Sequence, residues 1–346
     1  MSSFSERLGQ VVNNTVIGLA VSLAREHGIF QVLADSTEPL TSQQVANRRS
    51  LKERYVREIL NSLATAELVE VKVDATAPGV LVYSLESGAK DVMDSYLGAF
   101  VGIPALMARR YASVTACVPE NGPRGVRYTA HAEAAFSALS YYTAPKFVDA
   151  FLHCVPGLKD KLELGIDVLE IGSGYARMSA ILASKFPKSR FTASEVIPWL
   201  VEANRERWGD IPNLHYRVLD ACDIPESPDE SYDWILCSDV IHDLPEPLKA
   251  LQGTKRLLRK PDGLFTFVDM SSSGSPLVDR GKMLVAALYS ASAFLCVPDS
   301  YQGDKESHAL GACWGRQAAI DLGTQAGFSV TDSDIDDMHV LYVCRP

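Results

Sequence analysis

Val168-Leu-Glu-Ile-Gly-Ser-Gly174 is the stretch of sequence that decides the fold: a short apolar run leads straight into a glycine turn. One acid, Glu170, stands just ahead of the turn. A short apolar run of this length is typical of a buried strand. Glycines allow the backbone to turn tightly and to approach a ligand without a Cβ clash. The stretch therefore predicts a strand that ends in a ligand-binding turn.

From residue 166 onward, strand-like and helix-like segments alternate. Strands are expected at 167–171, 190–194, 214–218, 234–237, 263–268, 329–335 and 340–344. Amphipathic helices are expected between them at 176–186, 198–208, 246–259 and 314–326. Repeated strand–helix units predict a Rossmann-like α/β fold, in which a mainly parallel sheet of seven strands has helices on both faces. The last two strands are too close in sequence for a helical crossover, so they are expected to be antiparallel neighbours.

Residues 1–90 follow a different pattern, which is mainly helical. Apolar residues recur at helical spacing over 5–34, where Gly28 is expected to end one helix. Thr41 is a typical helix N-cap and precedes a run of helix formers. A third helix is expected at about 51–66, with its apolar residues on one face. The N-terminal part is therefore expected to contain at least three helices.

Two alternating segments follow these helices, at 68–73 and 80–85, with a Pro-Gly turn between them. They predict a β-hairpin. Helices followed by a hairpin predict a winged helix. The sequence thus divides into a winged-helix domain at 1–90, a helical linker or lid at 91–165 and a ligand-binding domain at 166–346.

The chain is acidic, which disfavours nucleic acid as a partner. Its 346 residues carry a net charge of −10, so its surface repels phosphate backbones. The best case for DNA binding is the basic group Lys52, Arg54 and Arg57 on the third helix. Residues 1–85, however, hold eight basic and nine acidic residues, a net charge of −1. A winged helix that binds DNA normally concentrates positive charge.

The cysteines and the N-terminal segment favour a cytoplasmic protein with no membrane role. The seven cysteines are scattered, odd in number and without a Cys-x-x-Cys motif, as expected for free thiols in a reducing compartment. The N-terminus lacks the apolar core of a signal peptide. No run of about 20 apolar residues, the length that spans a bilayer, is evident.

Two kinds of ligand fit a glycine turn at this point in an open α/β sheet. A dinucleotide site requires Gly-x-Gly-x-x-Gly, but residue 177 is Arg where the third glycine would stand. The charge of Glu170 is unfavourable beside a diphosphate and favourable beside a cation. S-adenosylmethionine carries a sulfonium and an ammonium group. The turn therefore favours S-adenosylmethionine over a dinucleotide.

Acids also stand at the ends of the next two strands. Glu195 ends the second strand, where a carboxylate can accept both ribose hydroxyls. Asp220 follows the third strand, and its position suits the adenine edge together with the amide of Ala221. Each acid alone has a plainer interpretation as a helix cap. The predicted cofactor-binding residues are Glu170, Gly172, Ser173, Gly174, Glu195, Val196, Asp220, Ala221 and Ser238.

This pattern resembles class I methyltransferases, and the winged helix resembles the dimerising domain of small-molecule O-methyltransferases. The tail adds to the resemblance. Residues 288–300, 310–317 and 326–328 look like the C-terminal signature of a winged-helix methyltransferase family found in mycobacteria, fungi and invertebrates. The resemblance implies a homodimer that uses S-adenosylmethionine and a small-molecule acceptor. One departure is Asp304-Lys305-Glu306, where a small, glycine-rich loop is usual.

His242 follows the fourth strand and is the candidate catalytic base. Similar O-methyltransferases place a base histidine in a His-Asp pair at this point, which here is His242-Asp243. An imidazole can take a proton from a hydroxyl acceptor, and Asp243 would orient it. Two alternatives remain open: His242 only lines the cofactor pocket, or it is purely structural.

Other features of the chain qualify this function. No metal is expected, because no compact acid cluster is evident beyond the cofactor acids. Tyr141, Tyr142, Tyr289, Phe294 and Trp314 are candidates for the walls of a substrate pocket, or for plain core residues. The alternative to an enzyme is a non-catalytic regulatory protein that binds S-adenosylmethionine without turnover.

Overall fold

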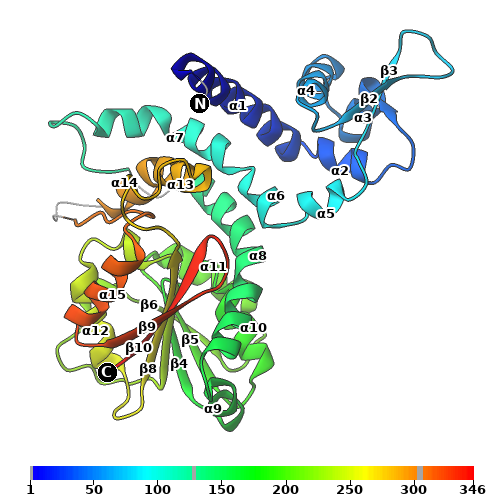
Figure 1. The fold of residues 1–346 in the computed structure, drawn as a ribbon. Coiled ribbons are helices and arrows are strands. Elements are labelled where there is room, and N and C mark those ends of the chain that lie inside the picture. The colour runs from blue at the N-terminus through cyan, green and yellow to red at the C-terminus, as the bar shows by residue number, and fades with distance from the viewer. Residues whose placement is uncertain (1–2, 127–129, 302–306) are drawn as a thin grey trace. The chain divides into compact units, whose positions relative to one another are not determined.

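A computed structural model describes residues 3–126, 130–301 and 307–346 (Figure 1). The segment Asp304–Glu306, where the sequence departs from the family pattern, lies outside these residues. The chain forms two compact units. One comprises Met1–Arg110 and Ala130–Leu139, and the other comprises Tyr111–Thr129 and Ser140–Pro346. The predicted linker region is therefore divided between both units.

The first unit is mainly helical. Its helices are α1 (Phe4–Glu26), α2 (Ile29–Ala34), α3 (Ser42–Arg49), α4 (Glu53–Thr65), α5 (Ala89–Met93), α6 (Tyr96–Phe100) and the first part of α7 (Ile103–Cys117). Gly28 separates α1 from α2 and has a left-handed φ of 67°. Thr41 caps α3 in a reciprocal pair, because its Oγ1 accepts from the Gln44 amide and the Gln44 side chain accepts from the Thr41 amide. The helix starts expected from the sequence are thus confirmed.

A small antiparallel sheet completes the winged helix. Its strands are β1 (Leu40–Thr41), β2 (Glu70–Val73) and β3 (Leu81–Ser84), in the order β1-β3-β2. Tyr83 of β3 is buried, and its hydroxyl donates to the Asn61 side chain of α4 at 2.6 Å. This contact fixes the hairpin to the helix. The predicted hairpin and winged helix are confirmed.

The second unit is built on a seven-stranded sheet. Its strands are β4 (Asp167–Ile171), β5 (Arg190–Glu195), β6 (Leu214–Val218), β7 (Trp234–Ser238), β8 (Leu264–Met270), β9 (Ser329–Asp334) and β10 (His339–Arg345). The order is β6-β5-β4-β7-β8-β10-β9. The first five neighbours are parallel, whereas β10 runs antiparallel to both β8 and β9. The predicted α/β class and the antiparallel final pair are confirmed.

Helices cover both faces of this sheet (Figure 1). One face packs against the C-terminal part of α8 (Ala130–Cys154) with α9 (Leu158–Leu164), α10 (Arg177–Lys185) and α11 (Pro198–Trp208). The other face packs against α12 (Pro247–Leu257) and α15 (Arg316–Gln325). Short 3₁₀ turns follow two strands, at η1 (Ala221–Asp223) and η2 (Ile241–Asp243). The two apolar cores leave the carboxyl ends of the parallel strands at one edge.

Two details differ from the sequence expectation. Strand β8 continues to Met270, two residues beyond the predicted end, so Asp269 lies within the sheet. In addition, residues 283–300 are long and apolar enough, by length and composition alone, to cross a membrane, which was not expected. In the structure they form two helices, α13 (Met283–Phe294) and α14 (Cys296–Ser300). Val285 and Leu288 of α13 are buried within the second unit.

Candidate functional site

The predicted site residues lie at the carboxyl ends of four adjacent strands. Because β6, β5, β4 and β7 are parallel neighbours, their carboxyl ends lie along one edge of the sheet. In an open α/β sheet, ligands bind beyond this edge, close to the point where the strand order reverses. Here the order reverses at β4, the strand that leads into the glycine turn. The structure thus places the turn at the position expected for a ligand.

The glycine turn depends on left-handed backbone angles. Gly172 has a φ of 62° and Gly174 a φ of 50°. The amide of Ser173 donates to the carbonyl of Ser194 on β5 at 2.8 Å, which ties the turn to the neighbouring strand. A Cβ on Gly172 would lie 2.6 Å from Cγ2 of Val240, whereas one on Gly174 would meet nothing within 4 Å. Gly172 therefore allows a close approach that another residue would prevent.

Two side chains from α11 hold the far side of the turn. Asn204 donates to the carbonyl of Gly174 at 2.6 Å, and the Trp208 indole donates to the carbonyl of Tyr175 at 2.9 Å. These contacts supply hydrogen-bond donors to two carbonyls of the turn, which lies beyond the end of β4. Sequence reasoning missed both residues, because nothing in the α11 sequence marks them as contacts of the turn.

Glu170 is buried, and its carboxylate is directed at α10. One oxygen accepts from both the amide and the hydroxyl of Ser179, with the amide nitrogen at 3.0 Å. Burial raises the pKa of Glu170 to about 7, against the lowering effect of the Ser179 hydrogen bonds, and nearby Glu195 raises it further. The acid ahead of the turn thus has a structural partner in the first turn of α10. Its predicted contact with a cationic ligand stays a prediction.

Glu170→Gln is expected to change how stability depends on pH. A carboxyl whose folded pKa is raised binds a proton in the folded chain at pH values where the unfolded chain has released it. The contribution of protonated Glu170 to the free energy of unfolding is therefore fully present below about pH 4.5 and is lost as the pH rises toward 7. The full shift corresponds to about 3 kcal/mol. Chemical unfolding of the ligand-free protein should find Glu170→Gln more stable than the natural protein at pH 8 and equally stable near pH 4.5. A constant difference between the two proteins across this range would contradict the assignment.

Glu195 lies at the end of β5 and holds the turn by its backbone. Its carboxylate accepts from the amides of Gly174 at 3.1 Å, Val196 at 2.8 Å and Ile197 at 3.3 Å. Burial raises the pKa of Glu195 despite these hydrogen bonds, which lower it. A carboxylate has about four lone-pair sites, so capacity for a ligand hydroxyl remains. The residue links the turn to β5 and can still accept from a ribose.

The remaining predicted cofactor residues are at neighbouring strand ends. Asp220 caps η1 by accepting from the Cys222 amide at 2.8 Å, and Ala221 is buried behind it. Val196 is about half exposed, and Ser238 is the last residue of β7. The plain interpretation of strand-end acids as caps therefore holds for Asp220. The structure brings all of these residues to one edge without assigning a ligand to any of them.

Buried polar atoms without partners also lie at this edge. Among the described residues, Ser173 Oγ and Asp239 Oδ1 have no hydrogen-bond partner. Asp239 follows β7 with a φ of 53°, an uncommon angle for a residue other than glycine. Burial raises the pKa of Asp239. Unpaired buried groups are costly, and a cationic ligand with hydrogen-bond donors fits such a set.

His242 is buried in η2 and faces the end of β8. Its Nδ1 lies 2.7 Å from Oδ1 of Asp269, which is fully buried. The second predicted partner, Asp243, lies on the other side of the ring, with its Oδ1 3.4 Å from Nε2. Asp243 was predicted to orient the ring, but Nδ1 of His242 contacts Asp269. The position of Asp269 as an acid at the end of the fifth strand could have indicated this contact.

The electrostatics of His242 follow from these neighbours. Burial acts to lower the pKa of His242, but the charges of Asp269 and Asp243 raise it well above the usual value. Cys296 of α14 is a further neighbour, and burial raises the pKa of its thiol to about 11. The acids thus favour the imidazolium form of His242, and the neutral form of the ring is the one that can accept a proton.

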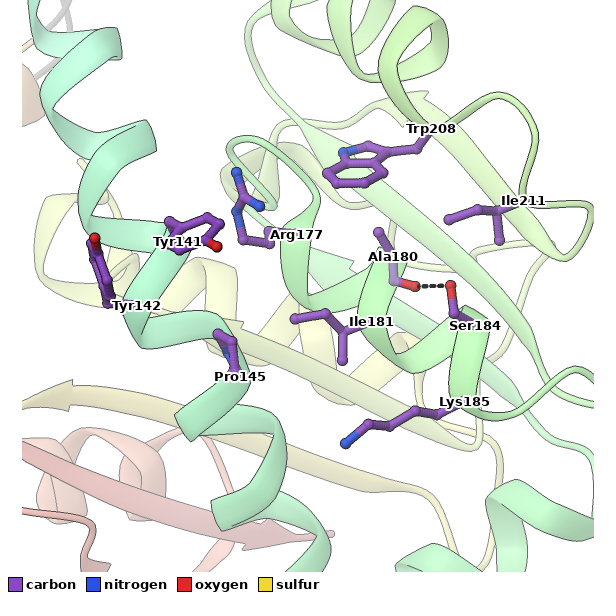
Figure 2. Close-up of a pocket in the computed structure, with 10 residues that line it drawn as sticks. All are labelled: Tyr141, Tyr142, Pro145, Arg177, Ala180, Ile181, Ser184, Lys185, Trp208 and Ile211. Atoms are coloured by element: carbon purple, nitrogen blue, oxygen red, sulfur yellow. Dashed lines mark hydrogen bonds between the residues drawn. The ribbon is translucent and has the colours of Figure 1, made fainter. Parts of the chain in front are cut away.

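A separate groove of about 640 Å³ lies beside the start of α10 (Figure 2). Arg177 extends between the rings of Tyr141 and Trp208, with its guanidinium carbon 5.0 and 5.8 Å from their centroids. Tyr141 and Tyr142 of α8 line this groove, and their predicted place in the wall of a substrate pocket stays a prediction. The remaining lining residues are Pro145, Ala180, Ile181, Ser184, Lys185 and Ile211.

Comparison with known proteins assigns two segments of the chain. Residues 169–267 match a family described as a methyltransferase domain, and residues 15–83 match the Rv2258c-like winged HTH domain. The chain is also 30% identical over 97 residues to malonyl-(acyl-carrier protein) O-methyltransferase 1 of Ilyobacter polytropus, a match that covers 26% of this chain. The chain spans 35% of that relative's length, and a tenth or less of the other curated relatives it matches.

Solved structures share the whole fold. Human N-acetylserotonin methyltransferase, solved in complex with SAM, has a TM-score of 0.70 at 15% identity, and 99% of this chain and 98% of that chain are covered. The mitomycin 7-O-methyltransferase has a TM-score of 0.71 at 17% identity, with the same two coverages. At these identities the likeness establishes the fold of both parts of the chain.

Proposed function

We propose that this chain, which joins an Rv2258c-like winged HTH domain to a methyltransferase domain, is an O-methyltransferase. It would transfer a methyl group from S-adenosylmethionine to a hydroxyl oxygen of a small molecule. The observation that carries the proposal is the buried pair of His242 and Asp269, at the end of the strands beside the glycine turn. Several relatives are named as O-methyltransferases, which supports oxygen as the acceptor atom.

S-adenosylmethionine would be held by the residues at the strand ends. Glu195 is suited to the ribose hydroxyls and Asp220 to the adenine edge, while the turn from Gly172 to Gly174 approaches the ligand with its backbone. The unpartnered Asp239 Oδ1 suits a cationic group. When bound, this cofactor supplies a methyl carbon that its sulfonium already activates.

The protein's own chemical task is to take the proton of the acceptor hydroxyl. Nε2 of His242 is the nitrogen proposed to take the proton, because Nδ1 contacts Asp269 at 2.7 Å. Asp243 Oδ1 lies 3.4 Å from Nε2. The acceptor oxygen would displace the thioether sulfur from the methyl carbon, so that the C–S bond breaks as the O–C bond forms, and the hydroxyl proton would move to Nε2 of the neutral ring. Asp269 then stabilises the imidazolium and keeps the ring oriented, as a positioning residue. His242 and Asp269 are both buried, which shields the pair from bulk water.

The test is methyl transfer from radiolabelled S-adenosylmethionine to small molecules in a cell extract. Label in an extractable small molecule, absent when the protein is omitted, supports the proposal. The alternative is a non-catalytic regulatory protein that binds the cofactor. Tight binding of S-adenosylmethionine by calorimetry without any transfer of label would favour that alternative.

We further propose a homodimer formed through α1. Phe4, Leu8, Val12 and Val16 recur every four residues, so they share one helix face, and each is 49–72% exposed. Within the winged helix, Arg57 pairs with Glu53 at 2.6 Å and Arg54 pairs with Glu58. These pairs reduce the positive charge available for DNA, which supports a protein partner at this domain.

Val12→Glu is expected to convert the dimer into a monomer. Burying a valine contributes about 1.5–3 kcal/mol, and a two-fold axis places two such residues in the interface. Light scattering after size exclusion at micromolar concentration measures the mass. Asn14→Glu, which adds the same charge at another exposed position of α1, should remain a dimer. A monomeric natural protein would refute the proposed interface.

A cytoplasmic location is also part of this proposal. The seven cysteines are all free thiols in the structure. Free thiols are typical of reducing compartments.

A further inference from the structure

His242, Asp243 and Cys296 form a compact group of three different donor atoms. A ring nitrogen of His242, a carboxylate oxygen of Asp243 and Sγ of Cys296 all lie within 4.8 Å of one another. We propose that these residues bind a zinc ion, and that the bound ion inhibits methyl transfer by occupying the nitrogen that serves as base. The inhibitory part rests on the proposed function, whereas the metal site stands on geometry alone.

The separation of two donors already fits a shared ion. Zinc binds nitrogen and oxygen ligands at about 2.0–2.2 Å in a tetrahedral arrangement, which places two such ligands roughly 3.3–3.4 Å apart. His242 Nε2 and Asp243 Oδ1 lie 3.4 Å apart. The sulfur comes from α14, which contacts η2. Little movement is therefore needed to bring an ion within reach of all three.

The other ring nitrogen of His242 has the partner that a metal-binding histidine requires. Histidine ligands usually bond their second nitrogen to a carboxylate, which fixes the ring and raises its basicity as a ligand. Asp269 Oδ1 fills this role at 2.7 Å from Nδ1. Asp269 is fully buried, and its Oδ1 also accepts from the amide of Met270 at 2.8 Å. The histidine is thus already oriented to present Nε2.

The donor types select zinc over harder cations. Thiolate and imidazole suit zinc, whereas magnesium and calcium prefer oxygen ligands alone. Three protein ligands would leave a fourth position open for water or a ligand. The carboxylates of Asp243 and Asp269 supply negative charge around the ring. No metal was expected from the sequence, because no compact acid cluster is evident beyond the cofactor acids. Cys296 is far from His242 along the chain, so local spacing does not reveal this group.

Occupation of this site has a direct consequence for the proposed reaction. An Nε2 that is bonded to zinc has no lone pair with which to accept the hydroxyl proton. Zinc is therefore expected to inhibit methyl transfer, and a chelator to restore it. Inhibition should be lost in variants that no longer bind the ion.

The site is tested first by metal binding, without reference to activity. The full-length protein, freed of metal, is titrated with Co²⁺ as a spectroscopic probe and with Zn²⁺ against a chromophoric chelator. We expect one equivalent of zinc and a thiolate-to-cobalt charge-transfer band. Cys296→Ser should lose the band and weaken zinc binding at least tenfold. Asp269→Asn should weaken zinc binding about 10–100-fold while keeping the band, since the residue acts through His242.

Cys154→Ser is the matched control, because Cys154 is an exposed thiol at the end of α8. It should keep the band, the zinc affinity and the activity. Circular dichroism and thermal unfolding verify that Cys296→Ser is folded. If Cys296→Ser binds zinc as the natural protein does, or if Cys154→Ser abolishes the band, the assignment is wrong.

Activity separates this inference from the proposed function. An active enzyme that is inhibited by zinc and protected by Cys296→Ser supports both. An active enzyme that shows no cobalt band overturns the zinc site alone. A cobalt band in a protein without methyl transfer overturns the proposed function and leaves the site.

Discussion

His242→Gln should lower the turnover number by roughly 10²–10⁴-fold, the usual contribution of a general base, and leave the affinity for S-adenosylmethionine unchanged. Glutamine retains a polar side chain of similar reach but cannot take a proton. The cofactor is expected to contact the strand ends rather than His242. Single-turnover rates with the true acceptor, together with calorimetric binding of the cofactor, provide the measurement.

The pattern of kinetic change distinguishes the roles that the sequence left open. Loss confined to turnover supports a base, whereas a higher dissociation constant for the cofactor indicates a residue that only lines the pocket. His215→Gln is the control, because His215 is exposed on β6 and should retain full activity. Full turnover by His242→Gln would refute the base role.

Asp269 provides a second arm of the same experiment. Asp269→Asn keeps the shape of the side chain but removes the charge that stabilises the imidazolium. A positioning residue predicts a smaller loss of turnover than His242→Gln, with an unchanged Michaelis constant for the acceptor. The double variant should be little worse than His242→Gln alone, because both residues act through one ring. Additive losses would indicate that Asp269 acts independently of His242.

The parallel part of the sheet could be predicted from the sequence because most of its strands are short, mainly apolar runs with a helical pattern after them. The edge that carries the site followed from the same pattern, since parallel strands end together. What could not be predicted is which acids meet which partners. His242 and Asp269 are 27 residues apart, and the strand that brings them together continues beyond its predicted end. Asp243, adjacent in sequence, was the only partner that local spacing could suggest.

The strand-end acids illustrate a second limit. Glu170 accepts from Ser179 in the first turn of α10, and Asp220 caps η1. A carboxylate at the start of a helix is stabilised by the free amides there, so the same sequence pattern arises from helix capping and from ligand binding. The sequence located these acids correctly but could not separate the two roles. Cys296 escaped prediction altogether, because its partners come from a different element.

Gly172→Ala should destabilise the protein strongly and weaken cofactor binding. The left-handed φ of 62° costs a residue with a Cβ about 1–2 kcal/mol. The new Cβ would also lie 2.6 Å from Cγ2 of Val240, and overpacking of this kind typically costs 1–3 kcal/mol. Relief of the clash requires movement of the turn, which displaces the backbone expected to approach the ligand. Denaturant unfolding and calorimetry with S-adenosylmethionine measure the two effects.

Gly174→Ala separates strain from contact, because Gly174 has a similar φ of 50° but an open space where its Cβ would lie. It should lose only the stability that the backbone angle costs. Val240→Ala introduced into Gly172→Ala removes the methyl groups that clash and should recover the steric part of the loss, after correction for Val240→Ala alone. If Gly172→Ala is no less stable than Gly174→Ala, the close approach to Val240 does not constrain the turn. If the double variant recovers stability but not cofactor affinity, the ligand itself needs residue 172 to have no Cβ.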